Sequence, residues 1–234
     1  MALIDNLVSY YKLDEASGNA LDAHGSNTLT DTNTVGTGTG KINNGRDFES
    51  GSAQYFTRTS AIISAWPFTV SAWIKLESTG AAKVIFSLDG DTLTHIAEII
   101  VNGSNVLQVF CEDAGVGNVN FTCGTTLTSG VWYHVMAVFN TGAFEVWLNG
   151  VSDGTATTTR NFPGVTRTRI GTRFYSGSAG DYWDGLIDEV GVWNVAKTGT
   201  DATALYNSGS GLAYPFSSGV VIPVFMNQYR QRWR

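Results

Sequence analysis

The sequence predicts an all-β protein with one short helix near its C-terminal end. Short segments alternate apolar and polar side chains, which is the pattern of strands with one buried face. Turn dipeptides separate these segments, and the chain holds 27 Gly but only 4 Pro. Charged residues make up only 15% of the 234 residues, which is unusual for a helical protein. Many short strands at this spacing favour a sandwich or a barrel.

The strand pattern is clearest in the segment FTVSAWIKL. There Phe68, Val70, Ala72, Ile74 and Leu76 share one face, and the residues between them share the other, so a half-buried strand is expected. Segments with strand character are found at residues 6–13, 68–76, 84–88, 95–101, 106–111, 118–123, 132–139, 144–148, 166–171 and 186–193.

Two hairpins and one helix complete the expected secondary structure. The Asn-Gly pair at 149–150 stands between alternating segments and is the strongest short-range hairpin signal. The Asn-Gly pair at 102–103 begins a slightly longer turn. Residues 198–206 read TGTDATALY and predict a short helix that Thr200 or Asp201 can cap. The Asn-Ser-Gly sequence at 207–209 ends this helix.

The acidic balance of the chain argues against nucleic-acid binding. The formal net charge is −6 and the pI is about 4.9, whereas a duplex-binding protein neutralises phosphates with Lys and Arg. The mild acidity does not require a cationic partner, because a soluble surface explains it. The sequence contains no run of about 18 apolar residues, the length needed to span a membrane as a helix. The N-terminus MALIDNLVSYYKLDE lacks the features of a signal peptide.

The cysteines and histidines do not indicate chemistry by themselves. Cys111 and Cys123 could face each other across a hairpin, but two reduced, partly buried thiols are favoured over a disulfide. His24, His95 and His134 are scattered along the chain. For the histidines, packed and hydrogen-bonded side chains are favoured over metal ligands or bases.

Five segments carry a family resemblance. They are LVSYYKLDEASGNALDAHGSN, GKINNGRDFESGSAQYFT, FTVSAWIKL, GVWYHVMAVFNTGAFEVWLNGVSDGT and YWDGLIDEVGVWNVAKTGTDATALYNSG. In this order they resemble the laminin-G-like (LamG) branch of the concanavalin A-like lectin/glucanase superfamily. The resemblance implies a two-sheet antiparallel jelly-roll sandwich over residues 1–212, followed by a linker and an Arg- and aromatic-rich tail over residues 213–234. The Arg46-Asp47 pair and the tail depart from the family pattern.

The resemblance implies a carbohydrate- or protein-binding module of the kind attached to extracellular or virion proteins, although enzymatic relatives share the fold. Glycosidases of this fold carry an E-x-D-x-E or E-x-D-x-x-E run, which this sequence lacks. Its acidic doublets at 14–15, 112–113 and 188–189 put neighbouring carboxylates on opposite faces of a strand. We therefore expect no enzyme activity, with a polysaccharide-degrading enzyme whose carboxylates come from different strands as the alternative.

A structural Ca²⁺ is a further prediction. The resemblance implies that the first and last strands lie side by side, which would bring Asp14 near Asp188, with Asp22 in the loop after the first strand. Carboxylates and loop carbonyls are the oxygen ligands that Ca²⁺ takes. The alternative is that Asp14 and Asp22 cap turns and that Asp188 hydrogen-bonds a neighbouring loop.

The expected glycan contacts lie in the segment RFYSGSAGDYWDG. Aromatic rings stack on sugar faces, which favours Tyr175, Tyr182 and Trp183, and Asp181 and Asp184 beside them can bind hydroxyls. The Gly and Ser content predicts a long mobile loop, the kind of segment that carries binding residues on a rigid scaffold. The alternative is that Trp183 folds back onto the core.

The C-terminal tail is the expected docking segment for other proteins of an assembly. It adds a local positive charge and an apolar stretch that can join a partner's sheet edge. With such an anchor, a member of this family that lacks a signal peptide resembles a virion-surface protein, such as a phage decoration or tail-fibre protein. The alternatives are a disordered tail, and an extracellular location or a cytoplasmic one before assembly. Two functions are therefore expected: a glycan-binding adhesion module on a virion, or a structural decoration protein without a glycan ligand. A homo-oligomer is compatible with both functions. The docking residues are Val221, Ile222, Phe225, Arg230, Arg232, Trp233 and Arg234.

Overall fold

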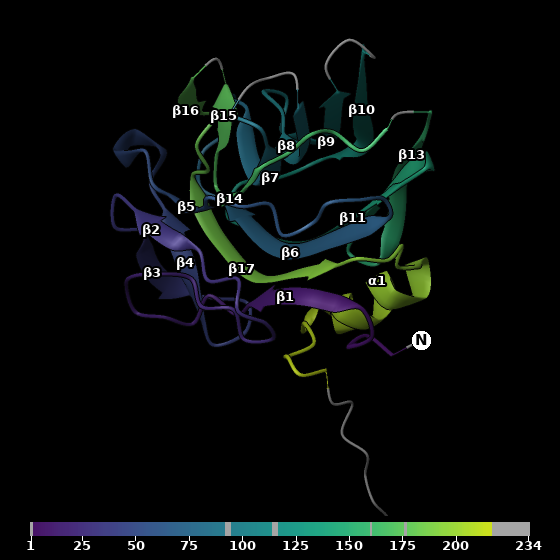
Figure 1. Ribbon diagram of the computed structural model, residues 1–234. Coiled ribbons are helices and arrows are strands. Elements are labelled where there is room, and N and C mark those ends of the chain that lie inside the picture. Colours follow the sequence, from purple (N-terminus) through teal and green to yellow (C-terminus); the bar gives the residue numbers. More distant parts are fainter. Residues whose placement is uncertain (1, 92–94, 114–116, 160, 176, 217–234) are drawn as a thin grey trace, which may run out of the picture.

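Two antiparallel sheets stack on each other and enclose the hydrophobic core (Figure 1). The computed structural model describes residues 2–91, 95–113, 117–159, 161–175 and 177–216, and the structural statements below concern these residues. The predicted fold, an all-β sandwich with one short α-helix, is confirmed.

The first sheet has eight strands. Seven of them run in the order β13-β12-β11-β6-β17-β4-β3, and β1 pairs with β17, so the expected pairing of the first strand with the last strand of the sandwich is confirmed. The strands are β1 (Leu7–Tyr11), β3 (Gly36–Thr39), β4 (Asn44–Phe48), β6 (Phe68–Leu76), β11 (Trp132–Asn140), β12 (Gly142–Leu148), β13 (Val151–Thr158) and β17 (Gly185–Trp193).

The second sheet has seven strands in the order β10-β9-β8-β7-β14-β5-β2. A separate small hairpin, β15 (Arg173–Tyr175) with β16 (Ser178–Gly180), follows β14 in the chain. The strands of the second sheet are β2 (Thr30–Thr32), β5 (Tyr55–Arg58), β7 (Lys83–Asp89), β8 (His95–Val101), β9 (Val106–Asp113), β10 (Gly117–Thr126) and β14 (Arg167–Ile170).

The central strand β6 buries both of its faces. Phe68, Val70 and Ile74 belong to the core between the sheets, as the alternation predicts. On the opposite face Trp73 is only 2% exposed, so the expectation of a half-buried strand is wrong. The reason is that helix α1 (Gly199–Tyr206) packs over this face, with the Tyr206 ring 5.8 Å from the Trp73 ring.

The helix is capped by Thr198, two residues before Thr200 and three before Asp201, the two expected caps. Thr198 has extended backbone angles, and its hydroxyl accepts a hydrogen bond from the backbone N–H of Asp201. The Asp201 carboxylate in turn accepts the backbone N–H of Thr198 at 2.8 Å. This reciprocal pair is a capping box, so Asp201 is its third helical residue and Thr200 lies inside the helix.

The outer side of the eight-stranded sheet is covered by α1 and by the residues that follow the helix (Figure 1). The Tyr214 ring stacks on Tyr10 at 5.0 Å, and the Phe216 ring meets Tyr10 edge-on at 5.1 Å. Residues 213–216, expected in the linker, thus pack against the sandwich. We call this side the covered face, and its buried cluster consists of Leu7, Tyr10, Met136, Val138, Trp193, Ala202 and Leu205.

The short strands β2 to β5 were missed because they have only three to five residues each, and β3 and β4 also have low β propensity. Strand β3 reads GTGT and strand β4 reads NGRDF. Arg46 in β4 is fully buried, and it donates to the carbonyls of Gly36 at 2.8 Å and Gly18 at 2.9 Å. Its guanidinium also lies over the Phe56 ring. The departure from the family pattern at Arg46 therefore fixes the N-terminal loops.

Three further predictions concern the cysteines, membrane-spanning segments and the tail. Cys111 and Cys123 are buried and not joined by a disulfide, as predicted. Among the described residues, none of the helices has the length and apolar character needed to cross a membrane. The docking prediction for the tail lies outside the described residues and stays a prediction, and this applies to Val221, Ile222, Phe225, Arg230, Arg232, Trp233 and Arg234.

Candidate functional site

The outer side of the seven-stranded sheet carries a row of four polar side chains and one aromatic ring. Arg169, Ser87, Glu98, Phe110 and Asn120 are successive cross-strand partners on β14, β7, β8, β9 and β10. Antiparallel partners project to the same side of a sheet, so these five side chains share one face. We call this side the open face.

Ion pairs hold the charged side chains at one end of this row. Arg169 bonds the carboxylate of Asp89 through one nitrogen and that of Asp91 at 2.7 Å through another. Arg167 bonds the second oxygen of Asp91 at 2.5 Å. Burial acts to raise the pKa of Asp91, but the two arginines outweigh it and lower that pKa. Both arginines are therefore paired with carboxylates at or just after the end of β7.

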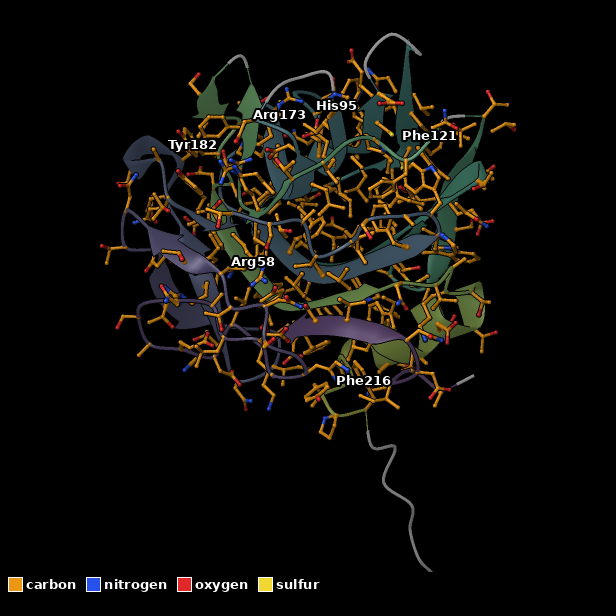
Figure 2. All side chains as sticks on the ribbon, viewed as in Figure 1. Arg58, His95, Phe121, Arg173, Tyr182 and Phe216 are labelled. Atoms are coloured by element: carbon orange, nitrogen blue, oxygen red, sulfur yellow. The ribbon has the colours of Figure 1, made fainter. Side chains whose placement is uncertain are left out.

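The hairpin β15–β16 lies beside this row and is tied to it by Arg173. One nitrogen of Arg173 donates to Glu98 Oε1 at 2.6 Å, and another pairs with Asp181 at the end of the hairpin. The Phe174 ring lies under the Arg169 guanidinium, with 4.4 Å between the ring centroid and the central carbon. Figure 2 shows Arg173 on the same side of the molecule as His95 and far from Phe216.

Two hollows meet at Arg173. The first, of about 320 Å³, lies over β8, β9 and β10, and we call it the cleft. The second, of about 310 Å³, lies along the hairpin and includes Asp181. The cleft presents an aromatic ring, two amides and a carboxylate together, which is the mixture of apolar and polar groups typical of ligand sites. Its lining residues are Ala82, Ile100, Gln108, Phe110, Glu112, Asn120 and Arg173.

Glu98 is the buried carboxylate beneath the cleft. Burial raises its pKa to about 7, although the neighbouring Arg173 acts to lower it. Its side chain has no exposed surface, and Oε2 has no hydrogen-bond partner among the described residues. The carboxylate thus positions Arg173 and titrates near neutral pH.

The structure corrects the prediction for Trp183. The indole is fully buried in the core between the sheets, and its backbone N–H donates to the carbonyl of Gly171 at 2.8 Å. This hydrogen bond ties the segment before β17 to Gly171, the residue after β14. Trp183 therefore cannot contact a soluble ligand, and the alternative that it folds back onto the core is confirmed.

The other predicted contact residues are scattered. Asp181 lines the hairpin hollow, but its carboxylate is paired with Arg173. Tyr182 is half-buried, and its hydroxyl donates to the carbonyl of Ala179 at 3.1 Å. Asp184 accepts the backbone N–H of Ser50 at 3.1 Å. The side chain of Tyr175 lies outside the described part of the structure.

The expected mobile loop is largely a hairpin. The backbone of Tyr175 pairs with Ser178 in strands β15 and β16. Thr172 secures the base of the hairpin through a hydroxyl bond to the carbonyl of Gly180 at 2.7 Å. The described residues of this segment are therefore paired in strands, in place of the expected loop.

The three carboxylates predicted to hold Ca²⁺ already accept hydrogen bonds. Asp22 accepts four backbone N–H groups, from Tyr10, His24, Gly25 and Asn27. Burial opposes the effect, but these four donors lower the pKa of Asp22. Asp22 thus caps a turn, as in the alternative given by the sequence.

Asp188 and Asp14 bind the loop between β3 and β4. Asp188 Oδ2 accepts the backbone N–H of Lys41 at 2.7 Å and of Ile42 at 2.9 Å. Burial raises the pKa of Asp188 to about 8. Asp14 accepts the backbone N–H of Asn44 at 3.2 Å. The described residues do not bring Asp14, Asp22 and Asp188 together as one ligand set, and Ca²⁺ binding stays a prediction.

A different set of carboxylates does come together. Oxygens of Asp47, Glu49 and Glu77 lie within 4.8 Å of one another, the single such group among the residues that the structure describes. Burial first, and then the neighbouring carboxylates, raise the pKa of Glu77. This cluster was not predicted because its members lie near the end of β4, directly after β4 and directly after β6, which are distant in sequence.

The cleft residues were also missed by sequence reasoning, although one signal was present. Glu98 is the single acidic residue in the apolar strand HIAEIIV. A carboxylate in a buried strand requires a partner, because burying an unpaired charge is costly. The partner, Arg173, lies 75 residues further along the chain, and the sequence offered no means of pairing the two.

Comparison with known proteins agrees with this architecture. A family model described as the concanavalin A-like lectin/glucanases superfamily (Laminin_G_3) matches residues 49–203, well over half of the chain. Among curated proteins, none matches this chain in sequence.

Solved structures share the fold at low sequence identity. Domain 4 of AbnA, an extracellular arabinanase from Geobacillus stearothermophilus in complex with arabinotriose, has a TM-score of 0.69 and 19% identity over 85% of this chain and 97% of that chain. The binding domain of Paraclostridial Mosquitocidal Protein 1 has a TM-score of 0.69 and 15% identity over 89% of this chain and 53% of that chain. The CBM40 of the Ruminococcus gnavus IT-sialidase, bound to α2,3-sialyllactose, has a TM-score of 0.56 and 14% identity over 61% and 84%.

At these identities the solved structures establish the fold, and the family match covers most of the strands that build it. The chain belongs to the concanavalin A-like lectin/glucanases superfamily.

Proposed function

We propose that this chain is a non-catalytic glycan-binding module and that the cleft on the open face receives the sugar. One observation carries the proposal: the partly exposed Phe110 ring lies in the cleft between Gln108, Asn120 and Arg173. A sugar ring can stack its C–H face on the phenyl ring while its hydroxyls bond the flanking amides. The cleft volume of about 320 Å³ suits a short saccharide segment.

The solved relatives support a glycan as the ligand. The arabinanase domain was determined with arabinotriose and the CBM40 with sialyllactose. Each of these proteins has the sandwich fold of this chain and holds a saccharide, which favours the same class of ligand here.

Binding rather than hydrolysis is proposed because of the state of the carboxylates. Glycoside hydrolysis needs two carboxyl groups that flank the scissile bond. Glu112 lines the cleft, but Glu98 beneath it has no exposed surface and is covered by Arg173. Hydrolysis of a polysaccharide that disappears in Glu112→Gln would favour the enzyme alternative.

The test compares two positions for the sugar. Binding on a glycan array identifies saccharides, and titration calorimetry then measures the affinity of Phe110→Ala and Tyr182→Ala. We expect Phe110→Ala to weaken binding at least about tenfold, as for an aromatic anchor. Tyr182→Ala should leave affinity unchanged, because its side chain lies outside the cleft and its hydroxyl bonds the hairpin backbone. The reverse result would move the site to the originally expected segment.

Display on a virion is a separate proposal that rests on the sequence of the tail. Its arginines and aromatic residues suit a docking peptide for an assembly. Deletion of residues 217–234 should abolish incorporation into particles while glycan binding persists. If the array yields no ligand but incorporation depends on the tail, a decoration role without a glycan is the better account.

A further inference from the structure

The cations around the cleft are already neutralised by the protein itself. Arg173, which lines the cleft, pairs with Glu98 and Asp181. Arg169, the next cation along the face, pairs with two carboxylates as well. A saccharide entering the cleft therefore meets guanidinium groups whose charge is offset, and a carboxylate on that saccharide would have to displace a partner.

Carboxylates outnumber cations in this network. The three arginines Arg167, Arg169 and Arg173 face the carboxylates of Asp89, Asp91, Glu98 and Asp181, and Glu112 also lines the cleft. Three positive and five negative groups give a formal charge of −2. Protonation of Glu98 leaves a charge of −1, so the sign holds on both sides of neutral pH.

We infer that the cleft selects uncharged saccharides and discriminates against those that carry carboxylates, such as sialylated or uronic-acid glycans. The inference rests on the proposed function and adds the class of ligand. Gln108 Nε2 donates to Asn120 Oδ1, so sugar hydroxyls bond the Gln108 Oε1 and Asn120 Nδ2 atoms, and the face of the sugar ring stacks on Phe110. A carboxylate on the saccharide would lie near Glu112 in a negative local potential, which repels it.

The fold itself does not decide between these classes of ligand. The related structures hold arabinotriose, which is uncharged, and sialyllactose, which carries a carboxylate. The choice must therefore come from the side chains on the surface that binds the sugar. In this chain those side chains are acidic on balance.

The experiment measures a ratio of affinities. Each uncharged glycan that binds on the array is paired with its analogue in which a hydroxymethyl group is oxidised to a carboxylate. At low ionic strength we expect the uncharged member to bind on the order of tenfold more tightly. Raising the ionic strength should narrow this ratio, because salt screens the repulsion.

A matched pair of variants locates the effect. Glu112→Gln should reduce the ratio, because it removes the cleft carboxylate that is not part of an ion pair with Arg173 or Arg169. Glu145→Gln removes the same charge from β12, on the other sheet, and should leave the ratio as in the unchanged protein. Equal or tighter binding of the acidic analogue would overturn the inference while the proposed function stands. An empty array would remove the proposed function, and the inference with it.

Discussion

The two outer sides of the sandwich are built from the same kind of strand, but one is buried and the other is exposed to solvent. On the covered face Met136, Val138 and Trp193 point outward and are at most 3% exposed, because α1 and the residues after it pack on them. On the open face the outward positions carry ion pairs, amides and Phe110, and two hollows remain. Apolar outward residues require a cover, whereas paired polar residues can face solvent.

The comparison separates structural residues from functional ones. His134 and Phe110 both project from the outer side of a sheet. His134 is 1% exposed, and its Nε2 lies 2.8 Å from the Ser71 hydroxyl. Burial lowers the pKa of His134 to about 3, so it stays neutral and packed, as expected. Phe110 instead borders a hollow. An outward aromatic or histidine is therefore informative only when nothing covers it.

The largest expected effect is on the covered face. Trp193→Ala should lower the free energy of unfolding by about 4 kcal/mol, because it leaves a cavity between β17 and α1 and frees the Leu3 carbonyl that the indole N–H bonds. Urea unfolding measures the loss. Glycan affinity of the folded fraction should be unchanged, and a matching loss of affinity would show that the two faces are coupled.

The next effect breaks the ion pair that ties the hairpin to the open face. Arg173→Met leaves Glu98 buried without its cation, and we expect a loss of about 3 kcal/mol at pH 8 from urea unfolding. At pH 5 the loss should be smaller, because a carboxyl whose pKa is near 7 is neutral there. The double variant Arg173→Met/Glu98→Gln should recover most of the stability. No recovery would mean that Arg173 acts through packing alone.

The third effect is a gain of stability on acidification from pH 8 to pH 5. Burial raises the pKa of Glu98 to about 7 and of Asp188 to about 8. For a carboxyl with a raised pKa, the stabilisation is complete below the unfolded pKa and is lost as pH rises through the folded one. The thermal midpoint should therefore rise as the pH is lowered from 8 to 5. Glu98 alone should add about 2 kcal/mol to the free energy of unfolding over this change.

Glu98→Gln is the control for this pH dependence. It should reduce the slope between pH 5 and pH 7, where Glu189, whose pKa burial also raises to about 7, still contributes, and leave the slope between pH 7 and pH 8, which Asp188 contributes. Below about pH 4 the direction reverses, because the lowered pKa of Asp22 makes its turn lose stability on protonation. A profile that is flat from pH 8 to pH 5 would contradict the raised pKa values.

The sequence predicted the long strands of the fold and missed most of the site. Strands such as β6 and β11 follow from their own alternation, because burial of one face is a local pattern. The cleft depends on register, which places Glu98 beside Phe110 and Phe110 beside Asn120. It also depends on a long-range pair with Arg173. Neither register nor a distant ion pair leaves a periodic signal in one sequence.

The errors at Trp183 and Trp73 have the same cause. Both were read from local context, as a loop residue and as the outward side of a half-buried strand. Trp183 is buried because it packs in the core between the two sheets, whose strands come from distant parts of the chain, and Trp73 is buried because α1 covers β6. Burial by an element distant in sequence is a property of the tertiary structure, so local pattern cannot report it.

The smallest expected effect concerns calcium and asks whether either face needs a metal. The oxygens of Asp22 and one oxygen of Asp188 already accept backbone N–H groups, and replacing those donors by a cation would leave them unpaired. If these hydrogen bonds alone hold the loops, as in the alternative to the predicted site, the thermal midpoint is the same in excess Ca²⁺ and in chelator. A rise with Ca²⁺ that Asp188→Asn abolishes would restore the predicted site. A rise that Asp47→Asn abolishes instead would assign the ion to the cluster of Asp47, Glu49 and Glu77, whose crowded carboxylates a cation would relieve.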